Sequence, residues 1–283
     1  MQVCNFRKTF AIGILTIKLV QKFYPTALAD KSWDNTGLLL DSSVDDATQP
    51  TSPIKVLLTI DLTQSVADEA IKKGAKFVMA YHPFIFRGLK SITPQDPQQN
   101  SLLKLVKNDI SVYSPHTAVD SAKGGVNDFL VTAIAGESNV QCSSPIEPDS
   151  ANPECGMGRL VNLNQPSTLN ELVSRVKEQL RLDHVQVAES RKGANQEIKS
   201  IAICAGSGGG VFKGVKADLY FTGELSHHEA LFFKESGSSV ICCNHSNTER
   251  PFLKFIKEQL QKELNSDDEV IISETDRDPF ETW

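Results

Sequence analysis

Short apolar runs alternate with amphipathic segments through the first half of the chain. The runs 54–61, 76–81 and 111–113 predict buried strands, and the segments 65–73 and 101–108 have the hydrophobic spacing of helices. Strands that alternate with helices are typical of an α/β sheet covered on both faces. We therefore predict an α/β unit in this half.

The second half repeats the same order. Predicted strands at 198–205, 217–222 and 239–243 are accompanied by helices at 226–234 and 252–264. These strands align one by one, in the same order, with those of the first half, which indicates an internal duplication. The predicted fold class is therefore α/β, with a duplicated α/β repeat.

The segment 143–153 interrupts this pattern. It contains three prolines among serines and acidic residues and has no hydrophobic periodicity, which is typical of an exposed connection. We predict a first repeat over residues 1–145, a linker over 146–154 and a second repeat over 155–283.

Composition narrows the class of protein. The 283 residues are 40% hydrophobic and 23% charged, which is typical of a globular chain with a substantial core. The formal net charge of -6 argues against direct nucleic-acid binding, which needs a basic face. Six cysteines without a C-x-x-C spacing indicate a reducing compartment. We therefore expect a cytoplasmic protein.

The N-terminal segment leaves one alternative to that location. The apolar run 10–17 is too short for a membrane span and is followed by Lys18 and Lys22, so we predict no membrane segment. We interpret this region as an ordinary first helix over about 15–24. The absence of acidic residues before Asp30 keeps a mitochondrial presequence as the alternative.

Histidines and carboxylates stand at the ends of the predicted strands. In His116–Asp120 and again in His245–Glu249, a strand ends in a histidine with an acid four residues on, and His82 ends another strand. Ligands of open α/β sheets bind outside the carboxyl ends of the strands. Three imidazoles and two carboxylates suit Zn, Fe or Mn better than Ca or Mg. We predict one or two divalent metal ions per chain.

A purely structural interpretation competes with the metal site. One His-x-x-x-acid motif is more often a strand end and a helix cap than a ligand pair, but its recurrence at equivalent points of a repeat reverses that preference. The carboxylates could bridge two ions, or Glu249 could act as a general base. His228, in the first turn after the N-cap Ser226, is the candidate for a proton shuttle, and His227 is expected at the surface.

Two turns remain ambiguous from the sequence. The glycine-rich stretch 206–210 follows a strand and is either a plain turn or a backbone contact for a substrate phosphate. The stretch 33–37, Trp-Asp-Asn-Thr-Gly, precedes a short apolar strand. We interpret it as a capped turn unless it lies beside the metal.

Several of these segments together resemble the Nif-three family, also labelled the GTP cyclohydrolase I type 2 family. They are 32–40, 81–83, 114–120, 124–127, 222–228 and 244–250, and 273–279 is similar to the tail of eukaryotic members. The resemblance implies two intertwined three-layer α/β domains with mixed sheets, a di-metal site between the repeats and a toroidal homohexamer.

The resemblance also implies the ligands, namely His82, His116, Asp120, His245 and Glu249. Tyr81 stands where many bacterial members have a first histidine of a His-His pair, and a phenol is a poorer ligand at neutral pH, so the number of ions stays open between one and two. The large central insertion of many members is absent.

Two hypotheses for function follow. The first is a metal-dependent hydrolase of a nucleotide or phosphoester, in which Glu249 or His228 moves protons. The second is a non-enzymatic adaptor, linked to transcription through protein partners, or a metal-handling protein. The two cysteines and the histidine of the zinc cyclohydrolase I are not recognisable, so we do not predict pterin synthesis.

Overall fold

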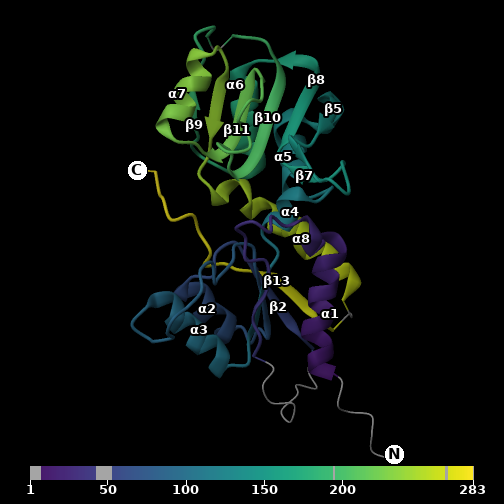
Figure 1. The fold of residues 1–283 in the computed structure, drawn as a ribbon, viewed down its shortest axis with the longest axis vertical. Coiled ribbons are helices and arrows are strands. Elements are labelled where there is room, and N and C mark those ends of the chain that lie inside the picture. Colours follow the sequence, from purple (N-terminus) through teal and green to yellow (C-terminus); the bar gives the residue numbers. More distant parts are fainter. Residues whose placement is uncertain (1–7, 43–52, 194, 265–266, 283) are drawn as a thin grey trace, which may run out of the picture. The chain divides into compact units, whose positions relative to one another are not determined.

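The chain forms two compact units in a computed structural model that describes residues 8–42, 53–193, 195–264 and 267–282 (Figure 1). One unit comprises residues 1–118 with 253–277, and the other comprises 119–252 with 278–283. The chain therefore changes unit after Ala118, after Phe252 and after Arg277. Neither unit is a continuous segment, which agrees with the expectation of intertwined domains.

These bounds differ from the repeats predicted over 1–145 and 155–283. The stretch 146–154 lies inside the second unit, where β6 (Glu147–Pro148) pairs antiparallel with β7 (Gly156–Met157). The segment is largely exposed and contains a strand, and the chain passes between the units at other points.

The first unit contains a mixed five-stranded sheet in the order β1-β4-β3-β2-β13. Its strands are β1 (Gly37–Leu40), β2 (Lys55–Thr59), β3 (Phe77–Ala80), β4 (Ser111–Ser114) and β13 (Glu269–Ile272). All neighbours are parallel except β1, which pairs antiparallel with β4. The carboxyl ends of β2, β3 and β4 therefore share one edge.

Helices cover both faces of this sheet (Figure 1). They are α1 (Lys8–Phe23), α2 (Gln64–Lys72), α3 (Pro97–Lys107) and α8 (Leu253–Glu263), with the short η1 (Thr26–Leu28) after α1 and α4 (Thr117–Ser121) at the passage to the second unit. α2 packs on α3, and α8 packs on α1, β2 and β13. The side chains of Thr63 and Asp96 cap the N-termini of α2 and α3.

The second unit contains a mixed six-stranded sheet in the order β5-β8-β10-β11-β12-β9. Its strands are β5 (Val140–Ser144), β8 (Arg159–Ser167), β9 (Gln186–Ala188), β10 (Ile198–Ser207), β11 (Leu219–Glu224) and β12 (Ser239–Cys242). The central trio β10, β11 and β12 is parallel, and the outer pairings are antiparallel. The strands of this trio are parallel to one another and lie side by side in chain order. The same holds for β2, β3 and β4, as the duplication predicted.

Helices pack on this sheet too. They are α5 (Val126–Ala135), α6 (Leu169–Leu180) and α7 (His227–Glu235), with the short turns η3 (Glu137–Asn139), η4 (Ser246–Thr248) and η5 (Arg250–Phe252). α5 packs on β8, β10 and α6, whereas α7 packs on β9 and β12. Capping boxes at Thr168 with Glu171 and at Ser226 with Glu229 start α6 and α7.

The predicted elements of both repeats are present, and the structure adds others. β8 and the edge strands β5 and β9 were not predicted, and neither was β13. β8 is exposed at about half of its positions and β13 has a single buried residue, Val270, so neither shows the continuous apolar run of a buried strand. The mixed α/β class is confirmed.

Two further expectations concern the cysteines and the membrane. The five cysteines in the described ranges are free, and Cys204, Cys242 and Cys243 are buried. Within those same ranges, no helix combines the length and the apolar character that a membrane span requires.

Candidate metal centre

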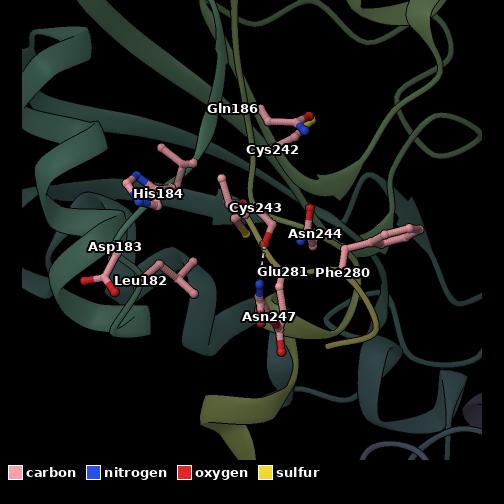
Figure 2. A pocket seen from close by; sticks show the side chains of 12 residues that line it. Leu182, Asp183, His184, Gln186, Cys242, Cys243, Asn244, Asn247, Phe280 and Glu281 are labelled. Atoms are coloured by element: carbon pink, nitrogen blue, oxygen red, sulfur yellow. Dashed lines mark hydrogen bonds between the residues drawn. The ribbon is translucent and has the colours of Figure 1, made fainter. Parts of the chain in front are cut away.

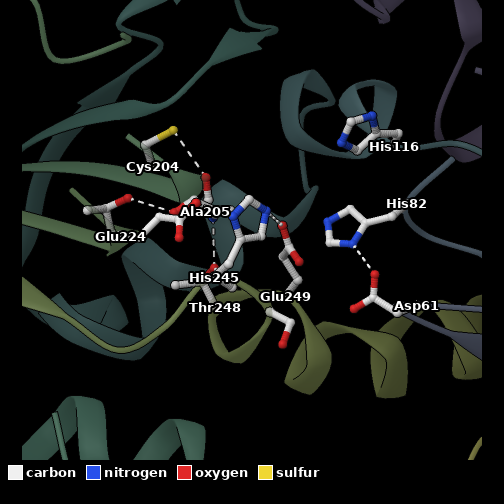
Figure 3. Close-up of polar contacts among 12 residues, drawn as sticks. Asp61, His82, His116, Cys204, Ala205, Glu224, His245, Thr248 and Glu249 are labelled. Carbon is white, nitrogen blue, oxygen red and sulfur yellow. Dashed lines mark hydrogen bonds and ion pairs between the residues drawn. The ribbon is translucent and has the colours of Figure 1, made fainter. Parts of the chain in front are cut away.

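His82 lies just beyond β3, beside the end of the neighbouring strand β2. The backbone ladder continues past both strands, because the N–H of His82 donates to the carbonyl of Ile60 at 3.1 Å. This pairing brings His82 next to Asp61, and its Nδ1 lies 2.9 Å from Asp61 Oδ1 (Figure 3). A carboxylate can only accept, so the pair indicates a proton on Nδ1 and the lone pair of the ring on Nε2.

His116 is held in the same way at the end of β4. Its φ of 35° turns the chain sharply after the strand, and its Nδ1 lies 2.7 Å from Asp34 Oδ1. Asp34 Oδ2 accepts from the hydroxyls of Thr36 at 2.7 Å and Thr117 at 2.5 Å. Burial alone would raise the pKa of Asp34. The hydrogen bond from His116, the charge of the His116 ring and the two hydroxyls lower that pKa to about 2. Asp34 is therefore a firmly ionised partner.

The two imidazoles of the first unit stand beside each other. The ring centroids of His82 and His116 are 5.4 Å apart, and the rings are nearly perpendicular. Tyr81 is fully buried, with its ring 5.5 Å from that of His82 and 6.2 Å from that of His116. Trp33, which is half exposed, meets His116 edge-on at 5.6 Å. Two residues of the stretch 33–37, Trp33 and Asp34, therefore contact His116, one of the predicted ligands.

His245 repeats the arrangement in the second unit. It follows β12 after Asn244, whose φ of 68° makes a turn like that at His116. His245 Nδ1 lies 2.9 Å from Oε1 of Glu224, the last residue of β11 (Figure 3). The other ring nitrogen, Nε2, lies 3.4 Å from Oε1 of the buried Glu249. The His-x-x-x-acid motif at 245–249 therefore does bring an imidazole nitrogen and a carboxylate together.

Gly206 forms the floor beneath His245 and Glu249. A Cβ at this position would lie 2.8 Å from His245 Nε2 and 3.0 Å from Glu249 Oε1, and the φ of +65° also favours glycine. The N–H of Gly206 donates to Thr248 Oγ1 at 2.8 Å, and its carbonyl accepts from Thr222 Oγ1 at 3.1 Å. Glycine is required here for close approach to the side chains of the site.

The rest of the glycine-rich stretch packs against other protein groups. A Cβ on Gly209 would lie 2.2 Å from a carboxylate oxygen of Glu229, and one on Gly208 would meet Phe212 and Thr222. A carboxylate beside the turn disfavours a second anion there. The turn interpretation therefore accounts for these glycines better than a phosphate contact does.

Asp120 and His228 have different surroundings. Asp120 is buried in α4, and its backbone carbonyl accepts from Asn127 Nδ2 at 2.9 Å. Burial raises the pKa of the Cys204 thiol, and the charges of Asp120 and Glu249 raise it further, so both acids act on one buried thiol. His228 is exposed at the start of α7, with its ring 5.3 Å from that of His227, and its role as a proton shuttle stays a prediction.

One device recurs at all three histidines that were predicted as ligands: each directs Nδ1 at a carboxylate. The pairs are His82 with Asp61, His116 with Asp34 and His245 with Glu224. Metal-ligating histidines almost always donate their other ring N–H to such a partner. The three acids were not predicted as site residues. Two of them follow the neighbouring strand in the sheet: Asp61 stands at the end of β2, beside the strand that leads to His82, and Glu224 ends β11, beside the strand that leads to His245.

The donor set fits a divalent transition metal. The second unit offers a nitrogen of His245 and an oxygen of Glu249, the first unit offers a nitrogen of His82, and imidazole with carboxylate suits Zn, Fe or Mn. The carboxylate partners fix the tautomer that leaves Nε2 as the ligand atom in each ring. If these histidines only ended strands and the acids only capped helices, none of the Nδ1–carboxylate contacts would be needed.

The second unit also contains a cavity of about 480 Å³, close to the turn that carries His245 (Figure 2). Its lining residues are Leu182, Asp183, His184, Val185, Gln186, Cys242, Cys243, Asn244, Asn247, Phe280, Glu281 and Thr282. This volume is in the range of small-molecule sites. The lining contains two acidic residues and neither lysine nor arginine, so it is not complementary to a phosphate.

Comparison with known proteins connects these motifs to a family. The sequence profile of Duf34/NIF3 (NGG1p interacting factor 3) matches residues 15–279. NGG1-interacting factor 3 of Saccharomyces cerevisiae is 47% identical over 274 residues, which cover 93% of this chain and 94% of that protein. Protein NIF3 homolog of Schizosaccharomyces pombe is 50% identical over 274 residues, covering 94% and 96%.

Solved structures show the same fold. A Bacillus cereus protein related to NIF3 has a TM-score of 0.81 at 22% identity, covering 96% of this chain and 99% of that one. Reduced HcgD from Methanocaldococcus jannaschii has a TM-score of 0.77 at 27% identity, covering 93% and 97%. As the resemblance of its motifs predicted, the chain belongs to the Duf34/NIF3 (NGG1p interacting factor 3) family.

Proposed function

We propose that this protein binds one or two divalent metal ions, Zn, Fe or Mn, and acts as a metal-dependent hydrolase. The proposed ligands are His82, His116, Asp120, His245 and Glu249. The observation that carries the proposal is the repeated Nδ1–carboxylate pair, because three histidines at strand ends share one tautomer and one kind of partner. Family membership supports it through the shared motifs.

The ion, when bound, would supply a Lewis acid and lower the pKa of water. The residues around it have separable tasks. Asp34 and Glu224 orient the rings of His116 and His245, and the low pKa of Asp34 keeps its charge in place. Glu249, buried and 3.4 Å from His245 Nε2, is the group placed to accept a proton from a reacting water.

The surroundings of the proposed ligands bear on the class of substrate. The sequence suggested a nucleotide or phosphoester, but the cavity of the second unit has no basic lining residue and the glycine-rich turn faces Glu229. Support for hydrolysis therefore comes from the donor set alone, and the substrate screen should not be restricted to phosphoesters.

A second candidate function is a non-enzymatic adaptor or a metal-handling protein. The printed name of the Saccharomyces cerevisiae relative, NGG1-interacting factor 3, describes that protein by a protein partner. An adaptor of this kind would bind its partner whether or not the ligands are intact. We also propose a homo-oligomer, a hexamer by the family resemblance, which light scattering on the purified chain would test.

Elemental analysis separates these possibilities first. Metal is counted per chain in the wild type and in His245→Ala and Glu249→Gln, with the exposed His227→Ala as the matched control. Near-stoichiometric Zn, Fe or Mn that is lost in the first two variants and kept in the third supports the site. A folded wild type that holds no metal and resists reconstitution contradicts it and leaves the adaptor.

Turnover of an ester and phosphoester panel by the metal-loaded protein then tests hydrolysis. Activity that disappears in His228→Ala while metal is retained would assign the proton-moving role to His228. A metal-loaded protein that turns over nothing in the panel, and whose partner binding is the same in Glu249→Gln, would favour the adaptor.

A further inference from the structure

Asn127 is a fully buried polar residue in the first turn of α5. Its side-chain amide makes hydrogen bonds in two directions. Nδ2 donates to the backbone carbonyl of Asp120 at 2.9 Å, and Oδ1 accepts from the backbone N–H of Ala205 at 2.9 Å. The amide therefore joins Asp120 of α4 to the end of β10, and Asp120, Asn127 and Ala205 all belong to the second unit.

The N–H of Ala205 needs this partner because β10 is irregular at its end. Pairing with β8 ends at Ile203, and the register with β11 shifts between Cys204 and Ser207. Such bulges take backbone groups out of the ladder and often lie beside functional sites. Side chains replace the ladder here, with Asn127 bound to Ala205 and Thr248 bound to Gly206.

The hydrogen bonds continue from this bulge to the proposed ligands. Gly206, which follows Ala205, lies against His245 Nε2 and Glu249 Oε1. Its N–H donates to Thr248 Oγ1, which in turn donates to the carbonyl of His245 at 2.7 Å. Asn127 is therefore linked to Asp120 on one side and, through the bulge, to His245 and Glu249 on the other.

The position of Asn127 is itself fixed by tight packing before and after it. A Cβ on Gly125 would lie 2.1 Å from the carbonyl oxygen of Val119, so the chain approaches itself too closely there for any other residue. Asp128 Oδ2 accepts from the N–H of Gly124 at 2.6 Å, and the buried guanidinium of Arg159 binds the same carboxylate. The amide thus has little freedom to shift.

We propose that Asn127 is a positioning residue of the metal centre: its amide holds the backbone of Asp120 to the bulge that packs against His245 and Glu249. This inference rests on the proposed function, because it assigns a role toward an ion held by those residues. The amide acts on ligand geometry in addition to satisfying two backbone groups. Loss of a partner that orients ligands typically weakens metal binding by about 10–100-fold.

The test compares the loss of both hydrogen bonds of the Asn127 amide with the loss of its donor alone. Asn127→Ala removes both hydrogen bonds, and Asn127→Asp keeps an acceptor for Ala205 while it loses the donor to Asp120. The matched control is Ser239→Ala in the same unit, since the buried Ser239 Oγ accepts from the N–H of Ser190 at 3.1 Å at the opposite end of β12 from His245.

Zn²⁺ affinity is measured by competition with a chelating dye on folded, metal-stripped protein, and unfolding by urea is measured beside it. We expect the dissociation constant to rise about tenfold or more in both Asn127 variants and to change less than twofold in Ser239→Ala. The visible absorption of the Co²⁺-loaded protein should also change in Asn127→Asp, because it reports the ligand set and not stability.

The outcomes are distinct. Asn127 variants that are destabilised like Ser239→Ala but bind Zn²⁺ as tightly as the wild type, with an unchanged Co²⁺ spectrum, would overturn the positioning role and leave the proposed function intact. A wild type that binds no Zn²⁺ in the same titration would overturn both. If Asn127→Ala does not fold, Asn127→Asp gives the decision.

Discussion

Asp34 and His116 are 82 positions apart in the sequence, yet Oδ1 of the fully buried carboxylate lies 2.7 Å from Nδ1 of the imidazole. This contact joins the turn before β1 to the end of β4, the strand that pairs with it. A buried ionised group is tolerated only when its charge is compensated, and here His116, Thr36 and Thr117 all contact it. The pair therefore fixes the orientation of a proposed ligand.

The first prediction concerns this carboxylate. Asp34→Asn removes the charge and the fixed acceptor, so His116 loses the partner that selects its tautomer. We expect metal affinity to fall by about 10–100-fold and stability by about 1–3 kcal/mol. Dye competition and urea unfolding measure the two effects. Asp109→Asn, an exposed change near Lys76, serves as control; equal affinities in both variants would contradict the prediction.

The second prediction concerns the floor of the site. In Gly206→Ala the new methyl group would meet His245 Nε2 and Glu249 Oε1, whereas Gly214→Ala has a similarly positive φ of +79° and nothing within 4 Å. Both changes carry the strain of a left-handed residue, about 1 kcal/mol. Only Gly206→Ala should lose metal, as counted per chain by elemental analysis. Full occupancy in Gly206→Ala would argue against ligation by His245 and Glu249.

The third prediction is a pH dependence of stability at Glu69 in α2. Burial would raise its pKa, but the N–H of Glu274, the hydroxyls of Ser273 and Thr275, and Lys73 lower it to about 2. Because the folded-state pKa is below the unfolded value, the stabilisation is complete above about pH 4.5 and is lost as the pH falls toward 2.

Glu69→Gln should therefore cost about 1–3 kcal/mol at pH 7, and the difference from the wild type should shrink on acidification to pH 3. Urea unfolding across that range measures it. The same substitution at the exposed Glu258 of α8 should be nearly neutral at every pH. A wild-type advantage that is independent of pH would mean that the charge of Glu69 contributes nothing.

The fourth prediction contrasts a buried arginine with a surface one. Arg159 binds Asp128 and the carbonyls of Gly156, Gly158 and Ala122 while almost fully buried. Arg159→Met leaves these groups without their donor and should cost about 3 kcal/mol.

The comparison is Arg191→Met, because Arg191 is mostly exposed and lies 3.5 Å from Glu235. Its loss should cost less than about 1 kcal/mol. Thermal and urea unfolding of the two variants give the comparison, and similar losses in both would show that the buried cluster is not a stabilising feature.

Much of the fold could be predicted because the relevant signals are local. The runs at β2, β3, β4, β10, β11 and β12 are short and apolar, since each strand is buried in the middle of a sheet. β8 and the edge strands β5 and β9 were not predicted, because they are partly exposed and depend on their neighbours for pairing. The passages between the units were not predicted either, because they follow from long-range packing within each unit.

The sequence by itself determined the chemistry that is available: which residues carry ring nitrogens and carboxylates, and that they follow strands whose carboxyl ends share an edge. Only the tertiary structure decided the partners of those groups. Asp61 meets His82 and Glu224 meets His245 across 21 positions each, because parallel strands in register bring their ends together. Hydrogen bonds between side chains act over about 3 Å, so the strand register and the bulge at Gly206 decide which groups can pair. Neither feature can be read from the order of residues along the chain.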